Sequence, residues 1–161
     1  MFFFHGTNTT NPKIIYEDKE DCFNINYTSE SNLLGRGTYF AEKSEYSLSY
    51  SFVYDANKKI RSMFYCRVLV GDSQKCQKHN GNIRDTEFKD QVKKIRYESM
   101  TDFLQGSNIF VVYKNRRAYP LYEIKYIPKW QNDWSLKNSL FHNEQRFIWE
   151  IKETVVYLIH F

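Results

Sequence analysis

The sequence predicts a single α+β domain in which antiparallel sheet predominates. Three observations lead to this fold class. The chain has 161 residues, which is enough for one hydrophobic core but too few for two. Aromatic residues make up 18% of it, with 13 Tyr and 13 Phe, and such side chains favour strands. Short apolar or alternating runs are separated by long irregular segments, which is typical of many short strands with few helices.

The chain begins with an apolar run followed by a long polar segment. The run Phe2-Phe3-Phe4 predicts a short buried strand that leads into His5-Gly6-Thr7. Residues 8–31 are polar and lack a clear period. We therefore expect a loop there with one short helix or turn.

A glycine-rich turn and a helix are expected next. The string Gly35-Arg36-Gly37-Thr38-Tyr39-Phe40 predicts a tight turn. A helix is predicted to start near Ala41 and to run past Phe52. One face of that helix would hold Tyr46, Tyr50 and Val53, which recur at helical spacing.

Three strands are predicted in the second half of the chain. Residues 63–70 alternate, with Phe64, Cys66, Val68 and Val70 on one face and Tyr65, Arg67 and Leu69 on the other. A polar connection follows over residues 71–96. Residues 109–113 form a continuous apolar run, which predicts a central strand. Tyr122, Ile124 and Tyr126 alternate with Glu123 and Lys125, which predicts a half-buried strand.

The composition changes after Pro128. Residues 129–143 are polar with isolated Trp, and the chain turns apolar again from residue 145. The run over residues 155–159 is compatible with a strand or with the end of a helix, because its length does not decide between them.

Charge and cysteine usage narrow the class of protein. A net charge of +4 suits an anionic ligand but falls short of a nucleic-acid-binding surface. The three cysteines are odd in number and do not predict a disulfide framework. Cys76 and His79 could share a metal ion, but no second pair accompanies them, so a free thiol and a surface histidine are the stronger interpretation. The apolar start is too short for a signal peptide or a membrane span. We expect an intracellular protein without a metal.

Several short motifs occur in a fixed order along the first four-fifths of the chain. They are Phe4-His5-Gly6-Thr7, Gly35 to Ala41, Ser47 with Tyr50, Tyr97-Glu98-Ser99, Ile109 to Tyr113 and Ala118 to Tyr122. Each is weak alone, but their order and spacing closely resemble the catalytic domain of the poly(ADP-ribose) polymerase family. The resemblance implies an ADP-ribosyltransferase fold of two packed, mainly antiparallel sheets with few short helices over residues 1–127. Residues 128–161 would form a divergent C-terminal extension packed on the same domain.

The resemblance also implies that NAD+ is the substrate and gives roles to the N-terminal motif. His5 resembles the histidine that hydrogen-bonds a ribose hydroxyl of the adenosine half, which is a positioning role. Gly6 resembles the backbone contact to the nicotinamide carboxamide, where the missing Cβ allows close approach. Thr7 would be a secondary ribose contact.

The resemblance places the nicotinamide ring between two aromatic side chains. Tyr39 and Tyr50 resemble this pair, and Ser47 resembles the hydroxyl that contacts the carboxamide. Ser47 and Tyr50 are three residues apart, so one helical turn can present both to one ligand. Tyr46 is better explained as an ordinary core residue.

The third catalytic position distinguishes between subgroups of the family. His5, Tyr39 and Ile109 occupy the three positions that the resemblance marks as catalytic. Chain-elongating members carry Glu where this chain has Ile109, and isoleucine can accept neither a hydrogen bond nor a proton. The resemblance is therefore strongest to the mono-transferring members, which are thought to rely on a carboxylate of the acceptor.

Two functions of different classes follow from these motifs. The first is transfer of one ADP-ribose from NAD+ to a protein acceptor, which includes the chain itself, with release of nicotinamide. The second is an inactive module that binds NAD+ or ADP-ribose without turnover. Intact His5, Tyr39, Ser47 and Tyr50 favour the first, whereas Ile109 favours the second. A nucleic-acid partner is disfavoured, and no membrane association is expected.

Overall fold

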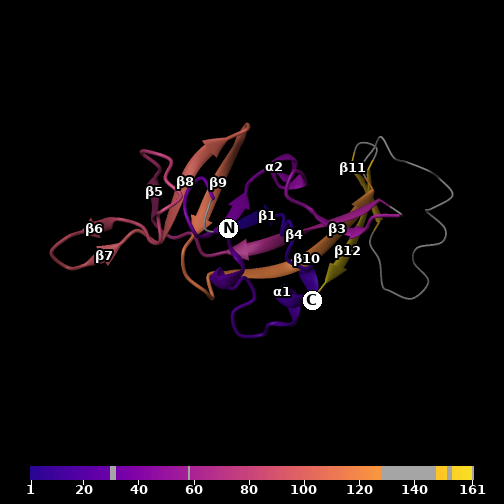
Figure 1. Cartoon of the computed structure of the whole chain (residues 1–161), viewed down its shortest axis with the longest axis horizontal. Helices are drawn as coiled ribbons and strands as arrows, with labels where there is room; N and C mark the ends of the chain where they lie inside the picture. Colours follow the sequence, from indigo (N-terminus) through magenta and orange to yellow (C-terminus); the bar gives the residue numbers. More distant parts are fainter. Residues whose placement is uncertain (30–31, 58, 128–147, 152–153, 161) are drawn as a thin grey trace.

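The computed structural model describes residues 1–29, 32–57, 59–127, 148–151 and 154–160. Among these residues a single ten-stranded sheet dominates the molecule (Figure 1). Its strands are β1 (Phe2–His5), β2 (Thr38–Ala41), β3 (Phe52–Asp55), β4 (Ile60–Val68), β5 (Ser73–Lys75), β8 (Ser99–Leu104), β9 (Ser107–Val112), β10 (Ala118–Ile127), β11 (Ile148–Ile151) and β12 (Thr154–His160). The smaller elements are the helices α1 (Pro12–Glu17) and α2 (Ser44–Leu48), the 3-10 turn η1 (Ile25–Tyr27), and the hairpin of β6 (Phe88–Asp90) and β7 (Ile95–Arg96).

The order of the strands in the sheet differs from their order in the sequence. Along the sheet the order is β11-β12-β10-β4-β1-β2-β9-β8-β5, with β3 added to β4. Every pairing in this sheet is antiparallel except that of β5 with β8. In Figure 1, β8 and β9 stand steeply against β4 and β10. The expected α+β class with mainly antiparallel strands is confirmed.

The first strand lies in the middle of the sheet. β1 pairs with β4 through Phe2 to His5 and with β2 through Phe4 opposite Ala41. Phe3 is 1% exposed, but Phe2 is 51% exposed and stacks on the ring of Tyr65. The prediction of a strand is therefore confirmed, whereas the expectation that all of it is buried is wrong, since only one face of β1 meets the core.

Strand β4 follows the predicted alternation. Phe64, Cys66 and Val68 are fully buried, while Tyr65 and Arg67 face outward with partial or full exposure. The strand begins three residues earlier than predicted and ends at Val68. Val70 is buried as expected but lies beyond the strand.

The predicted helix from Ala41 past Phe52 is wrong in its extent. Ala41 is the last residue of β2, and α2 covers only Ser44–Leu48. The helix ends where the Ser51 hydroxyl donates to the carbonyl of Leu48 at 2.7 Å. Phe52 then pairs with Ser62 of β4. An aromatic run thus joins the sheet, and this tertiary pairing outweighs the helical spacing of the tyrosines.

Strand β10 departs from the simple alternation predicted for it. A register shift lies between Pro120 and Tyr122, so the pattern before it does not continue after it. As a result Glu123, expected on the outer face, is 2% exposed and lies 3.7 Å from the Lys125 ammonium. Beyond it, residues 155–160 form the strand alternative left open by the sequence, since β12 pairs with β10.

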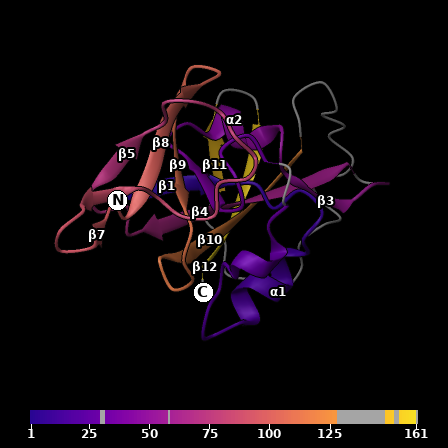
Figure 2. The same ribbon diagram turned by 60° about the vertical axis from the view of Figure 1, so that its left-hand side comes forward.

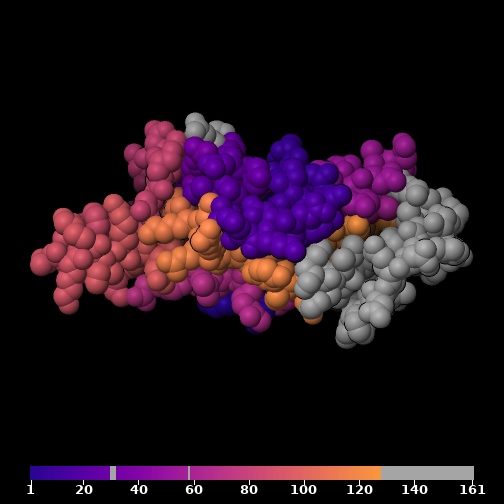
Figure 3. Space-filling model, turned by 90° about the horizontal axis from the view of Figure 1, so that it is seen from below, coloured from indigo at the N-terminus to yellow at the C-terminus, as the bar shows by residue number. Residues whose placement is uncertain are grey.

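The core has two parts on opposite faces of β2 and β9. One cluster contains Phe3, Phe40, Phe64 and Val112 together with residues near α1, and α1 packs against β10 (Figure 2). The other contains Leu34, Ala41, Met100, Ile109, Val111 and Tyr113. The β6–β7 hairpin stands out from this body at one end (Figure 3). No helix of the described residues has the length and apolar character needed to cross a membrane.

Candidate functional site

A hollow opens where β1 ends, beside β2 and α2. It is lined by every residue expected to bind NAD+: His5, Gly6, Thr7, Tyr39, Ser47 and Tyr50. They come from the end of β1 and the residues after it, from β2, and from α2 with the turn that follows it. The structure therefore brings these residues to a common cavity, although they are up to 45 positions apart in the sequence.

The imidazole of His5 has a defined tautomer. Its Nδ1 lies 2.7 Å from the main-chain oxygen of Tyr39. Because a carbonyl oxygen can only accept, Nδ1 carries the hydrogen and donates it. Burial lowers the pKa of His5 to about 4, and the bond to Tyr39 opposes this only in part. The ring is therefore neutral near pH 7, and its Nε2 is a hydrogen-bond acceptor.

Aromatic rings fix the orientation of that imidazole. The ring centroids of His5 and Phe23 are 4.9 Å apart in an edge-on arrangement, and Phe40 lies 5.3 Å away. Phe23 comes from the irregular segment after α1 and also lines the hollow. The histidine is thus held by packing as well as by its hydrogen bond.

The hydroxyl of Tyr39 is fully used by the protein. It accepts a hydrogen bond from the Leu34 amide at 2.7 Å and donates one to the Gly35 carbonyl at 3.0 Å. Burial raises the pKa of Tyr39 well above its ordinary value, so the hydroxyl stays protonated. Tyr39 can therefore offer a ligand the face of its ring, while its main chain positions His5.

Ser47 lies in α2 and Tyr50 lies in the turn that follows, so the two residues line the hollow but are not parts of one helix as expected. Tyr50 lies two residues beyond the end of α2, and its amide donates to the Ser47 carbonyl at 3.1 Å. Ser47 is 3% exposed, whereas Tyr50 is 41% exposed. One residue is thus fixed in the wall of the hollow, and the other stands at its rim.

Gly6 is required by packing against that turn. A Cβ at Gly6 would lie 2.5 Å from the Tyr50 carbonyl oxygen and 2.7 Å from that of Ser47. The amide of Asn8 also donates to the Tyr50 carbonyl at 2.7 Å. The missing side chain therefore lets the strand end and the helix end meet, a reason that the motif alone does not reveal.

Thr7 carries a polar atom without a partner. The residue is 8% exposed, and its Oγ1 has no hydrogen-bond partner among the described residues. A buried hydroxyl in this state costs free energy unless a ligand satisfies it. Thr7 lines the hollow, and its expected contact with a ribose stays a prediction.

Tyr46 lines the hollow in addition to packing against the core. Its ring centroid lies 5.3 Å from that of Tyr50. The sequence interpretation, which gave Tyr46 only a core role, missed this. Asn8, Phe23, Asn24 and Tyr27 also line the hollow. These four lie within residues 8–31, where the sequence has no periodicity to single them out.

Ile109 lies outside the lining of the hollow. It is fully buried on β9, between Ala41 of β2 and Asp102 of β8. It packs in the second core cluster, and Ala41 belongs both to that cluster and to the hollow. The position therefore lies next to Ala41 of the lining, and its apolar side chain packs in the core rather than in the hollow.

The lining is uncharged wherever the structure describes it. Hydroxyl, amide and aromatic side chains dominate it, and the described part contains no carboxylate, thiol, lysine or arginine. Such a surface suits a sugar and an aromatic amide through hydrogen bonds and stacking. It offers no set of metal ligands among the described residues.

Comparison with known sequences gives the same result as the motifs. The family described as the poly(ADP-ribose) polymerase catalytic domain matches residues 1–127. A probable poly(ADP-ribose) polymerase of Dictyostelium discoideum is 34% identical over 128 residues, which are 78% of this chain and 33% of that protein.

Two similar mammalian proteins carry a more specific name. Protein mono-ADP-ribosyltransferase PARP12 of Homo sapiens is 29% identical over 125 residues, and that of Mus musculus is 29% identical over 123 residues. In both cases the match covers 76% of this chain and 16% of the relative. The chain thus spans a third or less of the length of these curated relatives.

Proposed function

This chain belongs to the poly(ADP-ribose) polymerase catalytic domain family, and we propose that it is an NAD+-dependent mono-ADP-ribosyltransferase. In this proposal it moves one ADP-ribose from NAD+ to a protein acceptor and releases nicotinamide. The observation that carries the proposal is the hollow that neutral His5 lines together with Tyr39, Tyr50 and Ser47.

The hollow supports a defined pose for NAD+. His5 Nε2, the free acceptor of the ring, receives a ribose hydroxyl of the adenosine half. The rings of Tyr39 and Tyr50 take the nicotinamide between them, and the Gly6 main chain with Ser47 holds its carboxamide. Thr7 Oγ1 finds in a ribose hydroxyl the partner that the protein does not provide.

The chemical step needs orientation more than a base. The bond between the ribose C1′ and the nicotinamide nitrogen breaks, and its electron pair stays on the nitrogen. The sugar passes through an oxocarbenium-like state, which a rigid, oriented pose favours. An acceptor oxygen then forms the new bond to C1′.

Ile109 supports an acceptor that brings its own carboxylate. Its buried apolar side chain can neither orient a ribose hydroxyl nor remove a proton. A carboxylate acceptor has no proton to lose, so substrate assistance can replace the missing base. Repeated addition would require activation of a sugar hydroxyl, and for this reason we propose single transfer.

The same side chain favours the second candidate, an inactive module that binds NAD+ or ADP-ribose. Both candidates predict binding, and only the transferase predicts chemistry. Calorimetry with NAD+ therefore tests the hollow, and release of nicotinamide tests turnover.

Incubation of the chain with NAD+ labelled in the adenylate, with and without acidic acceptor proteins, tests the proposal. Label should appear on the chain or on an acceptor, and His5→Ala and Tyr50→Ala should lose it. Tyr54→Ala is the matched control, because Tyr54 is 52% exposed, outside the hollow and on β3. Binding without label under any acceptor condition would select the inactive module, and absence of both would refute the two candidates together.

A further inference from the structure

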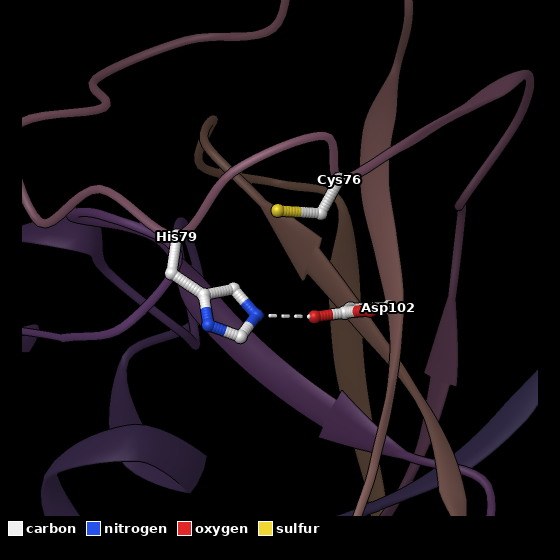
Figure 4. Close-up of side chains that lie close together, drawn as sticks. All are labelled: Cys76, His79 and Asp102. Carbon is white, nitrogen blue, oxygen red and sulfur yellow. Dashed lines mark hydrogen bonds and ion pairs between the residues drawn. The ribbon is translucent and has the colours of Figure 1, made fainter.

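A second cluster of reactive side chains lies on the β5–β8 side of the sheet, outside the lining of the hollow. Cys76, His79 and Asp102 each offer one ligand atom, and these atoms all lie within 4.8 Å of one another (Figure 4). From this arrangement we propose that the three side chains bind a zinc ion. The proposal does not depend on NAD+ binding or on transferase activity.

Cys76 and His79 alone are only a weak indication of a metal site, and the fold brings Asp102 to them as a third ligand. Cys76 follows β5, which runs parallel to β8 with Lys75 opposite Thr101. The amide of Cys76 donates to the Thr101 carbonyl at 2.8 Å, so the next residue of β8, Asp102, lies beside the thiol. His79 follows Cys76 by three residues, and a Cys-x-x-His turn is a spacing that zinc sites use.

The loop that carries the histidine is anchored beyond the cluster as well. The amide of Asn80 donates to the Leu33 carbonyl at 3.0 Å, and the Ile83 carbonyl accepts from the Arg36 amide at 2.9 Å. Both ends of the loop are thus tied to main chain. The ligands are held near one another before any ion binds, which reduces the entropic cost of forming the site.

The distances between the three ligand atoms are close to those around a tetrahedral zinc ion. His79 Nε2 already lies 2.7 Å from Asp102 Oδ2. Tetrahedral zinc with ordinary bond lengths separates its ligand atoms by about 3.3–3.7 Å. The imidazole and carboxylate must therefore part slightly, and any pair near the 4.8 Å limit must approach by about 1 Å. Side-chain rotation is sufficient for such movements.

The donor set selects the metal. A thiolate, an imidazole and a carboxylate together match Zn²⁺, whereas Mg²⁺ and Ca²⁺ prefer oxygen ligands alone. The side chain of His79 is 46% exposed and that of Asp102 is 18% exposed, so solvent reaches the cluster and can supply a water as the fourth ligand. On binding, the thiol proton passes to solvent and a zinc–sulfur bond forms.

The simpler interpretation is a partly exposed His79–Asp102 hydrogen bond beside an unrelated thiol. An exposed His–Asp pair contributes little to stability, about 0–1 kcal/mol. That interpretation explains the pair, and it limits Cys76 to packing against the second core cluster. The two interpretations differ in whether removal of the thiol changes metal affinity.

The ion would stabilise a region that supports Tyr39. Leu33 and Arg36, which contact the metal-bearing loop, flank the turn whose Leu34 amide and Gly35 carbonyl hold the Tyr39 hydroxyl. Cys76 itself packs against the core cluster that contains Ile109. The proposed zinc is therefore structural, and its removal should loosen this turn.

The test uses the full chain under reducing conditions. After incubation with ZnCl2 and removal of the excess, we expect about one zinc per folded chain. Co²⁺ bound in its place should give a thiolate charge-transfer band. Cys76→Ser should remove that band, and each of Cys76→Ser, His79→Ala and Asp102→Asn should weaken metal binding at least about tenfold.

Matched controls remove a thiol or a carboxylate elsewhere. Cys22→Ser changes a buried thiol outside the cluster, and Asp90→Asn changes a carboxylate on the β6–β7 hairpin. Both should keep the zinc and the cobalt band. Zinc should raise the unfolding temperature of the unchanged chain and of these two controls alone. No bound zinc, or equal binding by Cys76→Ser and Cys22→Ser, would overturn the proposal.

Discussion

The hollow beside β1 and the core around Ile109 share Ala41 as a common boundary, yet they differ completely in chemistry. The hollow presents a neutral imidazole, hydroxyls and tyrosine rings. The core one strand away holds the apolar side chain of Ile109, the position at which the resemblance implies Glu in chain-elongating members. Under the proposed function, holding NAD+ and activating an acceptor are separable tasks, and the hollow provides for the first.

Placing a carboxylate in the core around Ile109 should lower the unfolding free energy more than the other changes proposed below. Ile109→Glu buries an ionisable group in a fully buried position, which should cost about 3 kcal/mol or more of unfolding free energy. Denaturant titration measures this, with Ile109→Leu as the control of similar volume. The variant should still not elongate chains, because elongation also needs a site for the acceptor sugar. A ladder of products on a gel would contradict the proposed separation.

Filling the space at Gly6 should damage the hollow itself. Gly6→Ala forces the Tyr50 and Ser47 carbonyls away from contacts near 2.5 Å and 2.7 Å. We expect a loss of about 1–3 kcal/mol in stability and loss of NAD+ binding, measured by calorimetry. Gly106→Ala is the comparison, since a Cβ there meets nothing within 4 Å and only its positive φ of 79° is unfavourable. It should keep its affinity for NAD+, and equal losses in both variants would argue against a packing role for Gly6.

Acidification should weaken the fold through His5. Its pKa is about 4 in the folded chain against an ordinary 6.5, so between these values the unfolded chain binds more protons. The stability contributed by neutral His5 is therefore present above about pH 6.5 and is lost as the pH falls to about 4. The loss should be on the order of 2 kcal/mol, since the ring keeps some access to the hollow. His5→Gln should reduce the slope of stability against pH, and identical slopes would show that this histidine titrates normally.

Removing the unpaired hydroxyl of Thr7 should have the smallest effect. It should not lower the stability of the free chain, but it should lower the affinity for NAD+. Thr7→Val should leave the free chain as stable or more stable, because a buried oxygen without a partner disappears. Affinity for NAD+ should fall by about 2- to 10-fold if a ribose hydroxyl uses that oxygen. Calorimetry and thermal unfolding of the same samples measure both quantities. Unchanged affinity would assign Thr7 to the wall of the hollow rather than to the ligand.

Sequence patterns predicted the parts of the fold where local and tertiary preferences agree. The alternation of β4 was correct because one face of that strand meets the core along its whole length. Only part of the hollow was indicated by motifs, whose spacing carries information that periodicity lacks. The residues that the motifs indicated for NAD+ binding lie together in the hollow.

Predictions failed where distant contacts decide the local structure. The helix past Phe52 was wrong because Phe52 pairs with Ser62 of β4, and the exposure of Glu123 was wrong because a register shift interrupts β10. The sequence predicted that Tyr46 packs in the core, but not that it also lines the hollow. Asp102 could not be joined to Cys76 and His79 from spacing, because only the pairing of β5 with β8 brings them together.

The most direct test of the separation between holding NAD+ and activating an acceptor is the nature of the product. Intact-mass analysis should find single ADP-ribose additions on each modified site, and neutral hydroxylamine should release them, as it does from an ester of an acidic side chain. Products that carry several units in a chain, or a linkage that resists hydroxylamine, would contradict a site that lacks its own base and takes a carboxylate from the acceptor.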